Sequence, residues 1–342
     1  MNRRELLQTE VTQVDITAFD STPIIEAYDR MAFQARNLAA ACRIYDRMIA
    51  DRDCSIILCL AGSLFSAGLK NAVRDLVRFR MVDAIVSTGA IIVDQDFFEA
   101  LGFRHYRGTP FIDDELLRKN MIDRIYDTYI DEEELRVCDL TVADIADSLP
   151  PRPYSSREFI REMGRYLERE GKGEDSLIRE CHKNAVPIFV PAFSDCSAGF
   201  GLVAHQHKRG KEAMVTIDSA RDFLELTRIK VAAGETGLVM IGGGVPKNFA
   251  QDIVVAADIL QENPSMHRYA IQITVADERD GALSGSTLKE AHSWGKVDDV
   301  YEQMVFAEAT IAFPLLASYV YHRGGWEKRK PKAYADLFEE DG

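Results

Sequence analysis

The sequence lacks several features that define large classes of protein. Its apolar runs, such as "SIILCLAG" and "IFVPAF", are far shorter than the roughly 20 residues of a membrane helix, and "MNRRELLQTE" lacks the apolar core of a secretory signal. None of its six cysteines forms a C-x-x-C pair, which argues against a zinc ribbon, a disulfide framework and a thioredoxin-like motif. Positive charge is in deficit, since 41 Lys and Arg face 55 Asp and Glu, for a formal net charge of −14.

These absences predict a cytoplasmic protein that binds neither a membrane nor a nucleic acid. A negative total charge repels phosphate backbones and favours a cationic small substrate. What the chain does contain is 342 residues, 46% of them hydrophobic, which is enough for a sizeable core. We therefore interpret the whole span 1–342 as a single globular domain.

Short apolar runs alternate with helical patterns from about residue 55 onward. This alternation is typical of parallel strands joined by crossover helices, and strands covered on both faces are almost continuously apolar. The sequence therefore predicts an α/β fold with an open, mostly parallel Rossmann-like sheet and helices on both faces. The predicted strands are 55–61, 83–88, 187–192, 213–218, 237–242 and 269–274.

Two further segments have helical patterns. Residues 20–50 open on a Ser-Thr-Pro start and carry apolar positions at helical spacing, which predicts a helical N-terminal cover for the sheet. Residues 111–183 are highly charged and interrupted by "SLPPRPYSS" and "GKGEDS". We expect this second segment to be a helical insertion between strands of the sheet.

The run "LVMIGGGVPKNF" follows the pattern of a strand, three glycines and a helix start. Glycine lets the backbone approach a ligand closely, and a helix N-terminus offers free N–H groups to a pyrophosphate. The run is not G-x-G-x-x-G, so by itself it favours a tight structural turn over nucleotide binding. Three other strand ends, at 62–63, 88–89 and 195–197, also carry small, hydroxyl or carboxylate residues. Because ligands collect at the carboxyl ends of parallel strands, the four ends together favour one dinucleotide.

Six segments, "FQARN", "STGA", "PAFSDCSAG", "IGGGVPK", "EAHSWGK" and "FAEATIAFPLL", occur in the order and at nearly the spacing of the deoxyhypusine synthase family, whose offshoot is plant homospermidine synthase. The resemblance begins near residue 19. It implies NAD-dependent transfer of an aminobutyl group between amines through a lysine imine. It also implies a homotetramer with sites at a dimer interface. The long N-terminal segment that occludes the entrance in protein-modifying members is expected to be short or absent here.

By this resemblance Lys296 is the nucleophilic lysine. An ammonium cannot attack an imine, so Lys296 must be neutral, and shelter beside Trp294 would favour that form. Trp294 and Glu290 are implied substrate-binding residues, although a core aromatic and a solvated helix-end glutamate are the alternatives. The implied NAD contacts are Ser63, Ser66, Thr88, Gly89, Asp195, Gly242, Gly243, Thr274, Asp280, Ser284 and Glu308, the last of which replaces a family aspartate.

The resemblance breaks at the polyamine site. Phe200 and Leu283 stand where the family has aspartates that hold substrate amines, and Asn248 stands where it has a histidine. Loss of a carboxylate beside a buried ammonium costs about 3 to 5 kcal/mol, so the substrate is expected to differ. A diamine such as putrescine and a small amine acceptor are favoured, as in homospermidine synthesis.

Other interpretations remain open. The chain could modify a lysine of a translation factor, as deoxyhypusine synthase does, or it could be a catalytically silent NAD-binding or sensing module. An NAD-consuming deacylase is disfavoured because zinc-binding cysteine pairs are missing. His205 and His207 could share one face of a strand as metal ligands, but no third ligand is evident, so no metal is predicted. His292 is interpreted as structural.

Overall fold

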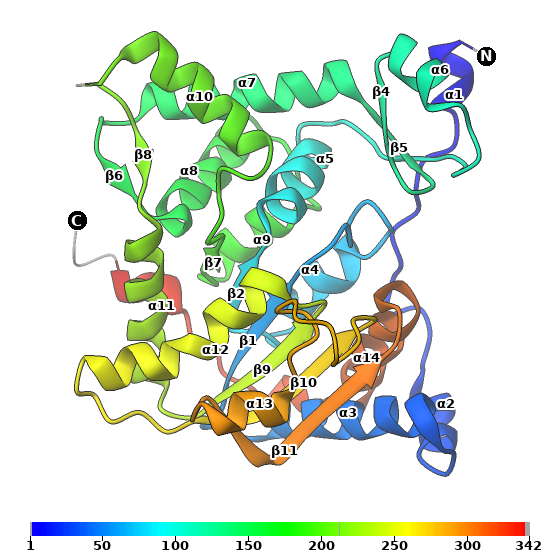
Figure 1. Cartoon of the computed structure of the whole chain (residues 1–342), viewed down its shortest axis with the longest axis vertical. Coiled ribbons are helices and arrows are strands. Elements are labelled where there is room, and N and C mark those ends of the chain that lie inside the picture. The colour runs from blue at the N-terminus through cyan, green and yellow to red at the C-terminus, as the bar shows by residue number, and fades with distance from the viewer. Residues whose placement is uncertain (1, 212, 339–342) are drawn as a thin grey trace.

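A six-stranded parallel sheet forms the centre of the computed structural model, which describes residues 2–211 and 213–338. The rest of the predicted span 1–342 lies outside the described residues. The strand order is β11-β10-β9-β1-β2-β7 (Figure 1). The strands are β1 (Ser55–Leu60), β2 (Ala84–Ser87), β7 (Ile188–Phe189), β9 (Thr236–Ile241), β10 (His267–Thr274) and β11 (Val297–Phe306). The predicted open parallel sheet is confirmed.

Alternate residues of the central strand β1 belong to two different hydrophobic clusters. Ile56, Leu58 and Leu60 pack in the larger cluster, whereas Ile57 and Cys59 pack in the smaller one. All six residues of β1 are buried, and β1 pairs in parallel with both β2 and β9. A strand that is covered on both faces has no polar side, which explains why this part of the sequence is a continuous apolar run.

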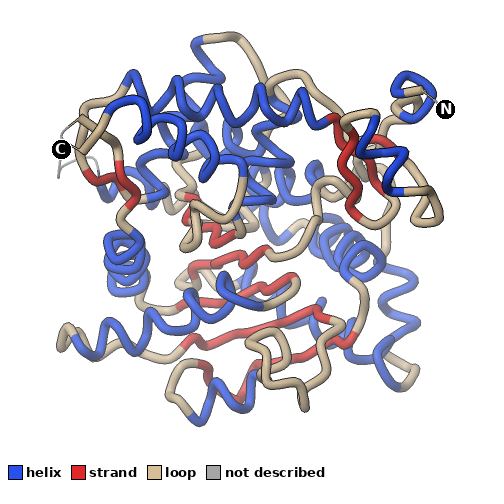
Figure 2. The backbone as a smooth tube through the Cα atoms, turned by 45° about the horizontal axis from the view of Figure 1, so that its top comes forward, coloured by secondary structure: helices blue, strands red, loops and turns tan. Residues whose placement is uncertain are grey.

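Helices cover both faces of the sheet, as predicted (Figure 2). On the side of the larger cluster lie α3 (Phe33–Ala50), α4 (Lys70–Arg78) and α14 (Ala309–Arg323). On the other side lie α11 (Ser219–Ala233), α12 (Gly244–Ile259) and α13 (Leu288–Ser293). No helix among the described residues is long and apolar enough to cross a membrane.

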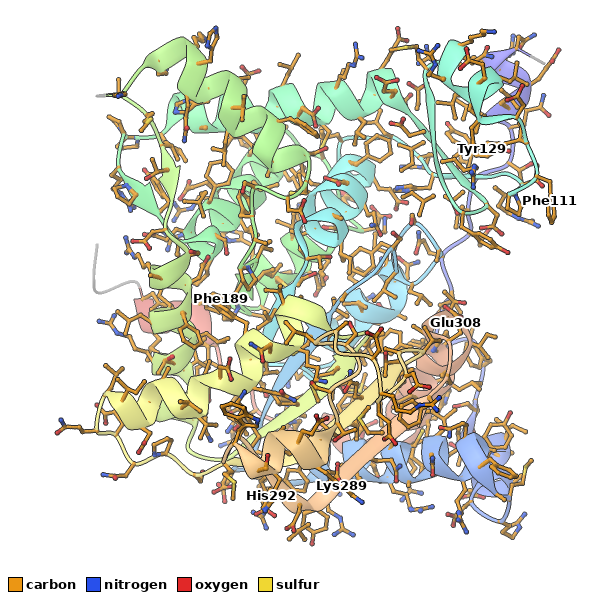
Figure 3. All side chains as sticks on the ribbon, viewed as in Figure 1. Phe111, Tyr129, Phe189, Lys289, His292 and Glu308 are labelled. Atoms are coloured by element: carbon orange, nitrogen blue, oxygen red, sulfur yellow. The ribbon has the colours of Figure 1, made fainter. Side chains whose placement is uncertain are left out.

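The predicted insertion at 111–183 is only partly helical. It contains α6 (Asp114–Lys119), α7 (Glu132–Ser148), α8 (Ser156–Arg169) and α9 (Leu177–Lys183), but also the antiparallel hairpin β4 (Ile122–Ile125) and β5 (Thr128–Asp131). The hairpin turns at Tyr126, whose φ of 51° is left-handed. Tyr129 of this hairpin packs with Leu6 of α1 (Arg3–Leu6), so the N-terminus is docked there (Figure 3).

Two strand predictions need correction. In the predicted strand 213–218 only β8 (Thr216–Ile217) is extended, and it pairs with β6 (Pro153–Tyr154) outside the central sheet. A local apolar pattern does not say which strand will be its partner. The sixth strand of the sheet is instead β11, which was not predicted because this edge strand is largely polar and only half-covered.

The predicted N-terminal cover is two helices, α2 (Thr22–Tyr28) and α3, instead of one. Ala32 is extended and Phe33 has a left-handed φ of 56°, which interrupts the helical hydrogen bonds between them. No glycine or proline marks this break. The remaining elements are η1 (Ala90–Phe97, a π-helix), α5 (Phe98–Ala100), β3 (Tyr106–Arg107), α10 (Ser197–Arg209), η2 (Gly325–Lys328) and η3 (Tyr334–Phe338).

Candidate active site

A cavity of about 1130 Å³ lies at the carboxyl ends of β1, β9, β10 and β11. Its walls come from the turns after these four strands, from Val11 and Thr12 near the N-terminus, and from the β4–β5 hairpin. Seven of the predicted cofactor residues line it: Ser63, Ser66, Gly242, Gly243, Thr274, Ser284 and Glu308. Residues far apart in the sequence thus meet at the edge of the sheet where parallel α/β folds bind ligands.

The triple glycine forms one wall of the cavity. Gly242 and Gly244 have left-handed φ values of 82° and 65°, which suit glycine at both positions. Gly243 lies against the loop that carries Ser284, where a Cβ would be 2.5 Å from the Ser284 Cα. This turn therefore holds the Ser284 loop in place, and its glycines leave backbone atoms accessible from the cavity.

The turn after β1 is held in place by the side chain of a residue that the sequence analysis did not identify. Buried Gln95 of η1 accepts hydrogen bonds through Oε1 from the backbone N–H groups of Phe65 (2.9 Å) and Ser66 (3.0 Å). The Ser66 hydroxyl donates to the Ser63 carbonyl at 3.0 Å. These bonds present both serines to the cavity in a fixed geometry.

Three charged side chains line the cavity. Glu308 at the start of α14 (Figure 3) accepts a hydrogen bond from the Thr310 backbone N–H at 2.9 Å and so caps that helix. Asp127 and Arg107 come from the hairpin and from β3. A carboxylate suits the hydroxyls of a ribose, and a guanidinium suits a phosphate, so the cavity offers groups complementary to both parts of a nucleotide.

Four of the predicted cofactor residues do not line this cavity: Thr88, Gly89, Asp195 and Asp280. Gly89 packs against Cys196, since a Cβ at position 89 would be 2.5 Å from its Sγ. Thr88 has a buried hydroxyl that lacks a hydrogen-bond partner among the described residues. Thr88 and Gly89 follow β2 and Asp195 follows β7, so these three residues lie at strands away from the cavity. Asp280 lies in the loop after β10 that also carries Ser284.

The group that includes Asp195 also contains a carboxylate that sequence reasoning missed. Asp94 of η1 accepts a hydrogen bond from the Ser197 backbone N–H at 2.7 Å. Burial raises the pKa of Asp94 to about 6, and the charges of Asp139 and Asp195 add to that rise. The predicted substrate residue Phe200 lies on the following helix, α10, and its side chain is 68% exposed.

Lys296 lies directly after α13 and does not line the cavity. Its side chain is only 12% exposed, and its Nζ lies 5.3 Å from the centroid of the Trp294 ring. Its charge partner is Asp252 of α12, with 2.5 Å between Nζ and Oδ1. The predicted Asn248 donates to the other oxygen of Asp252 at 2.8 Å. The sequence predicted the tryptophan beside the lysine, but not the aspartate.

The buried amine of Lys247 connects Lys296 and its partner Asp252 with the cavity. Lys247 of α12 donates from Nζ to the Leu283 carbonyl at 3.2 Å and to the Ser286 hydroxyl at 2.9 Å. Burial, together with the smaller effect of the charge of Lys296, lowers the pKa of Lys247 to about 8. Lys247 therefore ties the loop that carries Ser284 to the helix that carries Asp252. The last residue of "IGGGVPK" was the only sequence signal for it.

Glu290 and His292 have local structural partners. Glu290 forms a capping box with Thr287, and the hydrogen bond from the Thr287 backbone lowers the pKa of its carboxyl. His292 contacts the Val297 carbonyl through Nδ1 at 2.9 Å, which agrees with its structural interpretation. Figure 3 shows His292 and Lys289 on α13. The carboxylate of Glu290 is thus already engaged at a helix start.

The two histidines considered as metal ligands lie on helix α10, not on a strand. His205 is buried between Asp147, 2.7 Å from its Nδ1, and the Val215 backbone N–H, which donates to Nε2 at 2.8 Å. Both of its ring nitrogens are therefore engaged in structure. Within residues 2–211 and 213–338 no group of three potential metal ligands was found.

Comparisons with known proteins match this arrangement. A sequence profile described as deoxyhypusine synthase matches residues 23–320. The "Deoxyhypusine synthase-like protein" of Coxiella burnetii is 61% identical over 99% of this chain and 96% of its own length. The "Probable deoxyhypusine synthase 2" of Methanosarcina mazei is 38% identical over 100% of this chain and 97% of its own. These matches confirm the resemblance predicted from the motifs.

A solved structure supports the fold. A chain described as a "putative deoxyhypusine synthase from Entamoeba histolytica" superposes with a TM-score of 0.61 at 19% identity. The superposition covers 91% of this chain and 97% of that one. At this identity the likeness extends to the fold alone.

Proposed function

Because this chain belongs to the deoxyhypusine synthase family, we propose that it is an NAD-dependent transferase that moves an aminobutyl group between amines through an imine on Lys296. The observation that carries this proposal is the convergence of seven predicted cofactor residues on one cavity. Family membership supports a transferase in general. The cofactor, the transferred group and the lysine are the proposed details.

The cavity fits a dinucleotide in chemistry as well as in size. Gly242 and Gly243 bring bare backbone to it, Ser63 and Ser66 offer hydroxyls, and Glu308 offers a carboxylate. NAD, when bound there, would accept a hydride from the carbon beside the substrate nitrogen and later return it. The loop that carries Ser284 is held by Gly243 and by Lys247 of α12, the helix that also carries Asp252.

Lys296 is proposed to carry the transferred group. The lone pair of its neutral amine forms a bond to the imine carbon, the bond from that carbon to the first amine breaks, and this amine leaves with the proton that Lys296 releases. An acceptor amine then displaces Lys296 in the same way. The Trp294 ring above Nζ excludes water from one side and offers a π face to a substrate ammonium.

The residues at the positions where the family resemblance implies substrate-binding carboxylates favour a short diamine such as putrescine as donor and a small amine as acceptor. Phe200 and Leu283 present exposed apolar surface where the family resemblance implies carboxylates. Two ammonium contacts implied for a longer polyamine are therefore missing. The reaction resembles homospermidine synthesis and belongs to polyamine metabolism.

A homotetramer with sites at a dimer interface is proposed as the active form. Trp294 is 71% exposed and Leu283 is 46% exposed, although both belong to the proposed site. Large apolar side chains are rarely left exposed together in a monomer, which supports a second copy as the missing wall. All six cysteines are free, which supports the reducing cytoplasm as the compartment.

The test is a product analysis with covalent trapping. Purified protein receives NAD with putrescine alone, which can act as both donor and acceptor, or with spermidine as donor plus putrescine as acceptor. Mass spectrometry is expected to find homospermidine together with a borohydride-trapped adduct on Lys296. Lys296→Ala should abolish both. Lys289→Ala, which removes an exposed lysine of α13, should leave both unchanged.

Other outcomes would decide between the alternatives. NAD binding without any adduct would leave a silent NAD-binding module as the better description. Transfer to a lysine of a translation factor, with no small-amine product, would identify a deoxyhypusine synthase instead.

A further inference from the structure

The carboxylate of Asp252 holds two partners, one on each oxygen. Lys296 Nζ lies 2.5 Å from Oδ1, and the Asn248 amide donates to Oδ2 at 2.8 Å. Asn248 and Asp252 are one turn apart on α12, so the helix itself sets their contact. The Asp252 side chain is 28% exposed, whereas that of Lys296 is 12% exposed. Solvent therefore reaches the carboxylate more readily than it reaches the amine.

This pairing opposes the chemistry proposed for Lys296. A carboxylate in contact stabilises the ammonium form of a lysine, and an ammonium has no lone pair with which to attack. The arrangement is thus a resting state, and something must draw Asp252 away before the lysine can react.

A substrate amine is the group best suited to do so. Diamines carry an ammonium of the same chemistry as Lys296 Nζ, and the formal net charge of −14 attracts them. The nearby Glu290 already caps α13, and Phe200 and Leu283 carry no charge. Among these candidates only Asp252 presents a partly exposed carboxylate next to the lysine.

We propose that Asp252 is the binding site for an ammonium group of the substrate, and that this ammonium displaces Lys296 from the carboxylate. The inference rests on the proposed lysine-imine transfer. Two cations beside one carboxylate repel each other, and buried Lys247 adds a third amine nearby. Lys296 is consequently released from its ion pair and can approach the imine carbon. Binding of the correct substrate thereby activates the nucleophile.

Two probes with opposite expected responses test this inference. The first is butane-1,4-diamine, whose binding to the NAD-loaded protein is measured by calorimetry. Asp252→Asn should weaken binding about tenfold, because the variant lacks the charge partner of the ammonium. The second is butanal with cyanoborohydride, which alkylates neutral lysines and requires neither NAD nor a charged substrate.

Butanal should alkylate Lys296 several-fold faster in Asp252→Asn than in wild type, because the lysine is no longer paired with a carboxylate. Peptide mapping identifies which lysine is alkylated, and the exposed Lys289 serves as the reference. The alkylation rate of Lys296 in Asp252→Glu should lie between the rates in wild type and in Asp252→Asn. Asp258→Asn, at an exposed position near the end of the same helix, should match wild type in both assays. A misfolded variant would also expose the buried amines of Lys70 and Lys230 to alkylation. A gain in alkylation that peptide mapping finds at Lys296 but not at Lys70 or Lys230 therefore excludes a trivial loss of structure.

Unchanged diamine affinity, or unchanged alkylation of Lys296 in Asp252→Asn, would overturn the inference. A failure of the proposed transferase function would look different. In that case wild type would give no diamine-derived adduct with NAD, while the butanal assay would still report on the pairing of Lys296 and Asp252.

Discussion

Gly243 and Ser284 touch so closely that a single methyl group between them would not fit. A Cβ on Gly243 would lie 2.5 Å from the Ser284 Cα and 2.9 Å from its Oγ. The triple glycine and the 280–286 loop are therefore one packed unit. This contact places the loop at the edge of the cavity, since both residues line it.

Substitution of Gly243 should therefore weaken binding of the dinucleotide. We expect Gly243→Ala to displace the Ser284 loop at a cost of about 1 to 3 kcal/mol, which corresponds to a loss of NAD affinity of roughly 5-fold to 150-fold. Calorimetric titration with NAD measures the effect. The matched control is Gly281→Ala in the same loop, where a Cβ meets no atom within 4 Å. Equal affinities of the two variants would contradict the packing argument.

Glu308 has two separable roles, as a helix cap and as a cavity carboxylate. Glu308→Gln keeps an oxygen for the Thr310 N–H, so its stability should stay within about 0.5 kcal/mol of wild type, whereas Glu308→Ala should lose about 1 kcal/mol. Both variants should bind NAD several-fold more weakly and discriminate less against NADP, because the negative charge that repels its extra phosphate is gone. Urea unfolding and cofactor titration measure the two effects. Unaltered cofactor preference in both variants would argue against contact with a ribose.

Asp222 should make stability fall as pH rises toward neutrality. This carboxyl is fully buried, accepts from the Ser156 hydroxyl at 2.9 Å, and burial raises its pKa from 3.8 to about 7. Between these two values the unfolded chain releases the proton while the folded chain retains it, so stability is full below about pH 4 and is lost toward pH 7.

The Asn variant lacks this titration. Relative to Asp222→Asn, wild type should lose up to about 4 kcal/mol of unfolding free energy across that range. Urea unfolding at several pH values measures the difference, and Asp258→Asn serves as the exposed control. A pH-independent difference between wild type and Asp222→Asn would show that the folded carboxyl is already ionised.

Much of the fold could be predicted from local patterns. Buried strands such as β1 and β9 are continuous apolar runs, because helices cover both of their faces. The edge strand β11 has no such pattern, since one of its sides has no neighbouring strand. The break between α2 and α3 was also invisible, because it depends on a left-handed Phe33 and not on a glycine or a proline.

The candidate site could be predicted in part. Glycine and hydroxyl residues at strand ends indicated the cavity, because the carboxyl ends of parallel strands always lie at one edge of the sheet. Gln95, Lys247 and Asp252 were missed, since each is an ordinary helix residue in the sequence. Each contributes to the site by contacting a partner far along the chain, at a separation of 29 residues for Gln95, 36 for Lys247 and 44 for Asp252.

The sequence by itself determined that this chain forms a parallel α/β sheet of the deoxyhypusine synthase family, and that a lysine follows a tryptophan and a glycine near its end. Periodicity and short motifs carry that information because they depend on neighbours along the chain. Only the tertiary structure decided that Lys296 meets Asp252, that Gly243 meets Ser284, and that the lysine lies outside the cavity wall. Such contacts join separate elements, and their geometry is set by how helices and strands pack, which no local pattern records.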